Sequence, residues 1–365
     1  MNVSLIRTVI LGLLFTALPL SAFCEDEDMG IMVPSFEGEL GENVGTVLWL
    51  KVWRSLRDPL RHGAPSAAMW FTDEVFRGDQ SFEDVENDVA RNAVAVVLWG
   101  NTIAFGDGVL AQPRLCIIPN KVRRNGGENP VTWQVVVSTQ LTTLRLEVTI
   151  PQTRYQLPPI MLDNSLLSHY PNVHLVPVYR RRYNGPPAGE PIGKLGSSFR
   201  NVQNDGDYSE VIYDDDAGNG HMGWVYFPEL KGDIPIVDYV IGIIRLLRCD
   251  YQAAIDMLSR SAASADNTSA PLKIDSLLME ALATAKLKRD PGVQLELAEK
   301  LNPYLQSTAK FKIVYLISKI QAGPTKNKQA SLSALESEIA ATSYIFPLGD
   351  PWLETAKQML YAMRQ

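Results

Sequence analysis

The chain has 365 residues, a formal net charge of -7 and an apolar content of 46%. This length exceeds what one hydrophobic core usually serves, so we expect a folded protein of two or three domains. An acidic chain is a poor ligand for phosphate backbones, which excludes nucleic acid from the expected partners. Three cysteines are too few for a disulfide-rich scaffold, and the pairing of Cys116 with Cys249 stays open at this point.

The first residues predict an exported protein. A positive Arg7 precedes an apolar run over 8–18, and small residues then precede an acidic stretch at 25–28. This pattern is typical of a secretory signal peptide, which we place at residues 1–24. The run is shorter than the roughly 20 residues of a membrane-spanning helix, and no later stretch approaches that length. We therefore expect no integral membrane segment after cleavage.

Cleavage is expected after Ala22 or Cys24, because signal peptidases read small residues at this point. A lipid anchor on Cys24 is the disfavoured alternative, since the bulky Phe23 stands where a lipoprotein motif has a small residue. The expected location is therefore periplasmic or otherwise exported.

Residues 29–172 predict an α/β sandwich, because strand and helix patterns alternate in its first half. A helix over 42–57 is apolar on more than one face, which favours a core helix covered on two sides and leaves a subunit interface as the alternative. A second helix begins at Ser81, with Asp84 placed to complete the cap. The expected strands cover the ranges 31–36, 67–75, 93–99, 109–118, 132–138 and 144–150.

A glycine-rich hairpin at 106–108 joins two of these strands, because glycine adopts the positive φ that a tight turn requires. The segments 33–36 (VPSF), 96–100 (VVLWG) and 106–110 (GDGVL) resemble the amino-terminal domain of TolB-type proteins, whose relatives include FlgO-like and CsgG-like envelope proteins. The resemblance covers residues 31–118. It implies a protein-docking module of the bacterial envelope without catalytic activity.

Residues 173–231 contain five short strand patterns and predict a small β-barrel. The segments 192–195 (IGKL), 206–211 (GDYSEV) and 223–225 (GWV) resemble the bacterial Src-homology-3-like domain in order and spacing. The first loop, 180–187 (RRRYNGPP), is longer and more basic than in that class.

The resemblance implies binding of peptides or cell-wall stem peptides in an aromatic-lined groove, because flat rings give large contact area at little entropy loss. The candidate ligand-binding residues are Tyr179, Tyr208, Trp224 and Tyr226. The alternative is that Trp224 and Tyr208 fill the barrel interior. The triple arginine of the first loop favours a solvated loop over an acidic ligand.

No metal site is expected. The acidic run 214–220 fails the spacing of a calcium loop, because Gly218 occupies a ligand position, and it indicates a polar hairpin loop. His169 and His174 could reach one ion but lack a nearby third ligand. The two other histidines, His62 and His221, are expected in solvated loops.

Residues 234–365 change to the helical period and predict about seven stacked helices, the first two turning near Cys249. Gly242, Tyr251, Ala254 and Leu258 resemble the small and aromatic positions of a tetratricopeptide-like unit, in which small side chains let paired helices approach closely. Such an α-helical, solenoid-like repeat domain presents a concave face to proteins.

The sequence contains no nucleophile elbow, phosphate loop or paired-histidine zinc motif, so we expect no catalytic residues and no cofactor. The leading hypothesis is an exported, non-enzymatic protein-interaction or scaffold component of a bacterial cell envelope, which binds partners through the barrel and the helical repeat. The alternative is a peptidoglycan-binding module that recruits or regulates a cell-wall enzyme. A third hypothesis is an enzyme with an unfamiliar site in a pocket of the first domain.

Overall fold

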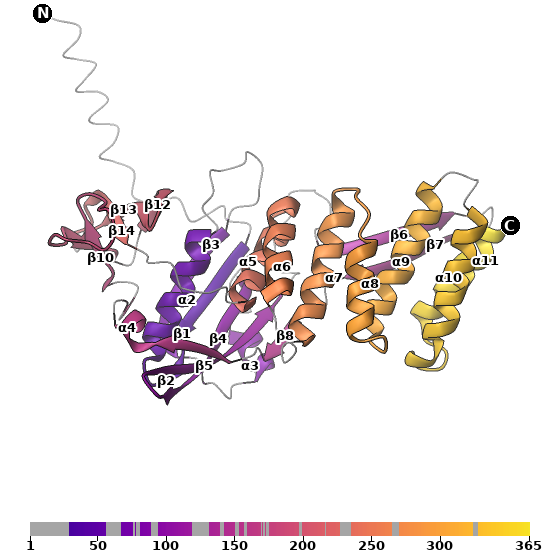
Figure 1. Cartoon of the computed structure of the whole chain (residues 1–365), viewed down its shortest axis with the longest axis horizontal. Coiled ribbons are helices and arrows are strands. Elements are labelled where there is room, and N and C mark those ends of the chain that lie inside the picture. The colour runs from indigo at the N-terminus through magenta and orange to yellow at the C-terminus, as the bar shows by residue number, and fades with distance from the viewer. Residues whose placement is uncertain are drawn as a thin grey trace, which may run out of the picture.

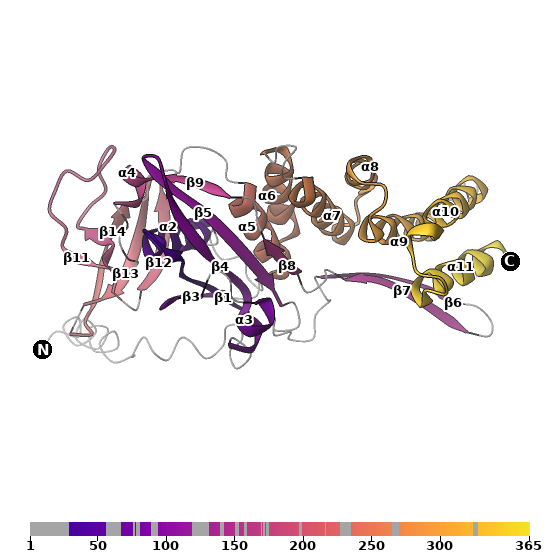
Figure 2. The same cartoon turned by 90° about the horizontal axis from the view of Figure 1, so that it is seen from below.

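The chain folds into an elongated, mixed α and β structure (Figure 1). A small sheet lies at one end, a larger sheet follows, and a row of helices extends to the other end (Figure 2). The predicted leader and three of the histidines, His62, His169 and His174, lie outside the described residues. The computed structural model describes residues 29–55, 67–75, 77, 81–88, 94–118, 131–138, 142–149, 153–156, 159–168, 170, 172, 175–196, 199–215, 217–226, 235–264, 270–323 and 328–365.

Seven strands form the larger sheet: β1 (Met29–Ser35), β2 (Glu37–Gly38), β3 (Ala67–Val75), β4 (Val94–Phe105), β5 (Gly108–Ile117), β8 (Thr153–Gln156) and β9 (Ile160–Asp163). Strand β1 runs parallel to β3 and β4, whereas β5 runs antiparallel to β4, β8 and β9. The predicted β4–β5 hairpin is confirmed, and the φ of Gly106 is 59°. Sequence reasoning missed β8 and β9, because four residues are too few for a clear alternation. The accompanying helices are α2 (Gly41–Ser55), α3 (Phe82–Asp88) and α4 (Asn164–Leu167).

Helix α3 packs on one face of this sheet. Its predicted cap is confirmed, since Ser81 Oγ accepts the Asp84 backbone N–H at 3.1 Å and donates to Asp84 Oδ2 at 2.6 Å. The Phe82 ring meets Trp99 of β4 edge-on, with 5.3 Å between the ring centroids. Residues 94–100 of β4 are all buried, as expected of a strand that is covered on both faces.

The predicted region of five short strands forms an open antiparallel sheet in the order β11-β10-β14-β13-β12. The pairing ends at β11 and β12, so the predicted closed barrel is wrong. Closure needs strands long enough to tilt and to bond neighbours on both sides, and two strands here have only two or three residues. The strands are β10 (Pro177–Tyr179), β11 (Gly193–Lys194), β12 (Phe199–Asp205), β13 (Tyr208–Asp214) and β14 (Gly220–Tyr226).

Helix α2 lies between the two sheets. Its Trp49 and Trp53 are almost wholly buried and stack on each other, with 5.7 Å between their ring centroids. Phe199, at the start of β12, meets both rings edge-on at 5.3 Å. Helix α2 also packs on β1. The predicted two-sided cover of this helix is therefore confirmed.

Strands β6 (Thr132–Ser138) and β7 (Thr143–Thr149) form a separate two-stranded ribbon, not a continuation of the larger sheet. The ribbon runs along the row of helices toward the carboxyl terminus (Figure 2). The helices of this row are α5 (Pro235–Leu247), α6 (Tyr251–Ser264), α7 (Ala270–Lys286), α8 (Gly292–Leu301), α9 (Gln306–Ala322), α10 (Lys328–Thr342) and α11 (Pro351–Arg364). They confirm the predicted seven helices within the described residues.

The ribbon and the helices are joined by packing and by hydrogen bonds. Trp352 Nε1 of α11 donates to the Glu147 carbonyl at 2.9 Å, and Gln321 Nε2 of α9 donates to the Val136 carbonyl at 2.6 Å. An isolated two-stranded ribbon is marginally stable in water, so these helices supply the cover that it needs. The buried apolar side chains of the ribbon are Val135, Val137, Leu146 and Val148.

Consecutive helices of the row pack against each other. A Cβ on Gly242 of α5 would lie 2.6 Å from Leu258 Cγ of α6, so only glycine permits this approach. The predicted turn between these helices is confirmed at Cys249, whose φ is 59°. Cys249 is exposed and Cys116 is buried, and no disulfide joins them.

Among the residues that the structure describes, no helix is both long enough and apolar enough to cross a membrane.

Leu146→Ala should lower the free energy of unfolding by about 2–5 kcal/mol, because it leaves a cavity between the ribbon and the helices. Val136→Ala on the exposed face of the same ribbon is the matched control and should change stability by less than about 0.5 kcal/mol. Urea unfolding followed by far-ultraviolet circular dichroism measures both. Equal effects of the two variants would contradict the proposed packing.

Candidate functional site

The four predicted aromatic residues lie on one face of the smaller sheet. Tyr179 of β10 pairs in register with Trp224 of β14, and Tyr208 of β13 pairs with Tyr226 of β14. Trp224 and Tyr226 are two residues apart on one strand and therefore point to the same side. Cross-strand partners also share a side, so all four belong to one surface. We call this surface the aromatic face.

The opposite face of the same sheet belongs to the core. Val178, Val211 and Val225 are fully buried there and alternate along their strands with the aromatic residues. Trp224 and Tyr208 therefore lie on the face opposite these valines. Tyr208 is nevertheless buried, as the alternative expected, whereas Trp224 stays partly exposed.

The basic loop 180–187 folds over part of the aromatic face. Tyr208 Oη donates to the Gly185 carbonyl at 2.8 Å, and only 2% of Tyr208 remains exposed. The Tyr183 ring stands edge-on to Tyr179, with 6.3 Å between the centroids. Tyr208 therefore supports the loop, whereas the other three members of the face stay partly exposed and available for contact.

Sequence reasoning missed two side chains of this surface. Met222 precedes Trp224 by two positions on β14, and 57% of it is exposed. The alternation along β14 could have revealed Met222. Tyr183 comes from the loop, and no local pattern indicates that this loop returns to the sheet.

Arginines of the loop place positive charge beside the aromatic face. Arg182 forms an ion pair with Asp205, and the Arg181 guanidinium carbon lies 5.4 Å from the centre of the Tyr183 ring. Burial raises the pKa of Tyr179 above its ordinary value of 10.0, so this phenol stays neutral at physiological pH. Rings beside guanidinium groups suit a ligand that carries carboxylates.

The acidic run after β13 forms a hydrogen-bonded hairpin loop, as predicted. Asp215 accepts the backbone N–H groups of Asn219 at 2.8 Å and of Ala217 at 3.0 Å, and His221 Nε2 lies 2.9 Å from its Oδ2. These contacts hold the pKa of Asp215 well below its ordinary value, with the Asn219 backbone N–H as the largest cause. Within the residues that the structure describes, no group of three His, Cys, Asp or Glu side chains could hold a metal ion.

Comparisons of the chain with protein-family models, curated proteins and solved structures gave no match. What the aromatic face can do follows from its own groups. Aromatic rings and guanidinium groups bind through contact area and charge, and an arginine cannot act as a general base at neutral pH. The arrangement is therefore suited to binding.

Tyr208→Phe should loosen the loop 180–187 while keeping the ring in place, because it removes only the hydroxyl that bonds Gly185. We expect a loss of about 1 kcal/mol in stability and faster trypsin cleavage at Arg180 and Arg181, both exposed. Timed digestion with mass spectrometry measures the cleavage. Tyr226→Phe is the matched control and should leave the rate unchanged. Equal rates in all three proteins would contradict the role of Tyr208.

The Asp215 carboxyl should stay ionised as the pH falls through 3.8, its ordinary pKa. Because its folded pKa is lowered, its stabilising effect is complete above 3.8 and is lost only when the pH falls through the lower folded value. A carbon-detected NMR titration of the carboxyl group measures this. His221→Ala removes one contact and should move the midpoint upward. A wild-type midpoint at 3.8 would contradict the described loop.

Proposed function

We propose that this chain is an exported, non-enzymatic interaction protein of the bacterial cell envelope. In this proposal it binds a partner protein through the aromatic face of its smaller sheet and presents a second surface on its helices. The observation that carries the proposal is the convergence of Tyr179, Trp224 and Tyr226 on one partly exposed surface, opposite a buried face.

Physical chemistry supports this use of the surface. Tyrosine and tryptophan lose little conformational entropy on contact and are enriched at interaction hot spots. The class assigned to the smaller sheet in this proposal is Src-homology-3-like, supported by the order of its sequence motifs along five antiparallel strands. Export is supported by the leader pattern of residues 1–24.

A second candidate function is recognition of peptidoglycan. The exposed Arg180 and Arg181 favour it, because they lie next to the aromatic face and could pair with the carboxylates of stem peptides. In this case the helices recruit or regulate a cell-wall enzyme.

A photo-crosslinking amino acid in place of Met222 tests the main proposal. Expressed in its native host, the protein should form adducts with one partner protein in the envelope fraction. Adding Trp224→Ala should abolish the adducts, because loss of a hot-spot ring costs at least about 2 kcal/mol. The same amino acid in place of Ile103 is the control, since Ile103 is exposed on a strand of the larger sheet.

Adducts of equal yield from both positions, or none from Met222, would exclude the aromatic face as a protein-binding surface. Sedimentation with purified cell-wall sacculi separates the second candidate. Co-sedimentation that Trp224→Ala abolishes would favour peptidoglycan over a protein partner.

A further inference from the structure

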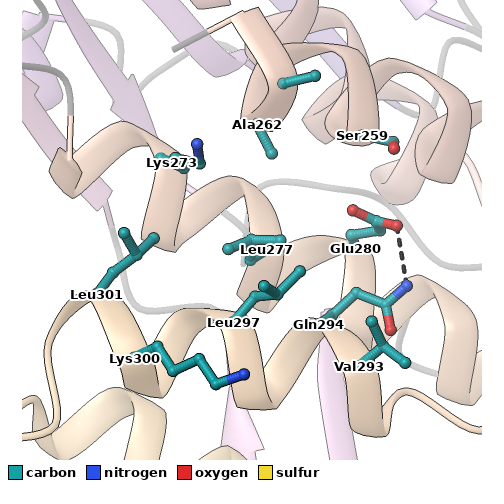
Figure 3. Close-up of a pocket in the computed structure, with 11 residues that line it drawn as sticks. Ser259, Ala262, Lys273, Leu277, Glu280, Val293, Gln294, Leu297, Lys300 and Leu301 are labelled. Atoms are coloured by element: carbon teal, nitrogen blue, oxygen red, sulfur yellow. Dashed lines mark hydrogen bonds between the residues drawn. The ribbon is translucent and has the colours of Figure 1, made fainter. Parts of the chain in front are cut away.

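A groove of about 500 Å³ lies among helices α6, α7 and α8. Leu277 of α7 and Ala262 of α6 form part of its apolar floor (Figure 3). Helix α7 and helix α8 run side by side along it, so a guest would lie against two helices at once. This groove is separate from the aromatic face, because the smaller sheet lies at one end of the molecule and α6, α7 and α8 lie nearer its middle (Figure 1).

Helix α8 turns an apolar stripe toward solvent at this groove. Val293, Leu297 and Leu301 follow one another at intervals of four residues and are 67%, 45% and 40% exposed. The stripe spans about 12 Å along the helix, a little over two turns. Residues four apart share one face, so a second helix with the same spacing could cover all three. An exposed apolar stripe with this spacing is typical of surfaces that bind an amphipathic helix.

The two ends of the groove differ in charge. Lys273 of α7 lies near the end formed by Leu301, whereas Glu280 of α7 lies at the opposite end (Figure 3). Lys300 of α8 adds a second ammonium group to the lining. The distance between Lys273 and Glu280 along α7 is about 10 Å. A guest that lies along the groove therefore meets cations near one end and a carboxyl group at the other.

The end of the groove near Glu280 also contains a hydrogen-bond acceptor without a partner among the described residues. Gln294 Nε2 donates to Glu280 Oε1 at 2.9 Å, but Gln294 Oε1 is buried and has no hydrogen-bond partner among the described residues. Glu280 itself is 7% exposed, and burial raises the pKa of its carboxyl group. The Gln294 oxygen is closed to solvent, so it belongs to the packing of α8 on α7 and is not a contact for a guest.

We propose that this groove binds an amphipathic helix of a partner protein. Apolar side chains of that helix contact Val293, Leu297 and Leu301, and its acidic side chains face Lys273 and Lys300. This inference rests on the proposed function as an interaction protein and names the chemistry of one partner. Charge complementarity selects an acidic helix over a basic one. The four-residue spacing of the stripe matches the spacing of apolar side chains on one face of a second helix.

The probe is a fluorescein-labelled synthetic helix of about 18 residues, which is five turns. It carries leucines at intervals of four residues and glutamates beside them. A second peptide has each glutamate replaced by lysine, and a third has its leucines dispersed around the helix. Fluorescence anisotropy with the full mature chain should show at least about tenfold tighter binding of the first peptide than of the other two.

Three variants locate the binding. The double substitution Lys273→Glu and Lys300→Glu should invert the preference, so that the lysine peptide binds more tightly. Leu297→Asp should weaken the acidic peptide by at least about tenfold, because it places a charge on the apolar stripe. Leu348→Asp is the matched control, since Leu348 is fully exposed outside the groove, and it should change nothing. Circular dichroism verifies that each variant is folded.

The inference is overturned by the absence of saturable binding, by equal binding of the acidic and basic peptides, or by binding that survives the charge reversal. Dodecanoate, a small anionic amphiphile, tests a different ligand. If it binds saturably and its binding depends on Lys273 while no peptide binds, the groove takes such an amphiphile and not a helix. Trp224→Ala should leave peptide binding intact. Failure of the peptides while Met222 still crosslinks would reject this groove alone, and the reverse pattern would reject the aromatic face alone.

Discussion

The contact of Phe199 with Trp49 and Trp53 determines which face of the smaller sheet is turned outward. These three rings hold the start of β12 against helix α2, which also packs on the larger sheet. A sheet with one face held on a core must turn its other face outward. The rings of Tyr179, Trp224 and Tyr226 are on that outward face, and their exposure therefore depends on a helix more than a hundred residues earlier in the chain.

The ribbon β6–β7 has a comparable role for the helices. It runs along the helical row (Figure 2) and is hydrogen-bonded to α9 and α11 through Gln321 and Trp352. Helix α5 in turn packs on α2. The row is thereby connected to the rest of the chain at both of its ends, and the groove of α6, α7 and α8 and the aromatic face belong to one structure.

Local patterns predicted much of this fold. The capping pair Ser81 and Asp84, the hairpin at Gly106 and the close helix approach at Gly242 depend on residues near each other in sequence, and all three are confirmed. Barrel closure was predicted wrongly, and no local pattern indicated that the ribbon packs on the helices. Both depend on which surface an apolar strand face meets, and two-residue alternation shows only that such a face exists.

By itself, the sequence determined the type and order of most elements, and it placed Tyr179, Tyr208, Trp224 and Tyr226 in strands, because periodicity is a property of neighbouring residues. The tertiary structure alone decided that these four share a face, that the loop 180–187 buries Tyr208, and that three helices leave an apolar groove with cations near one end. Those features arise from contacts between residues far apart in the chain, which spacing along the sequence does not encode.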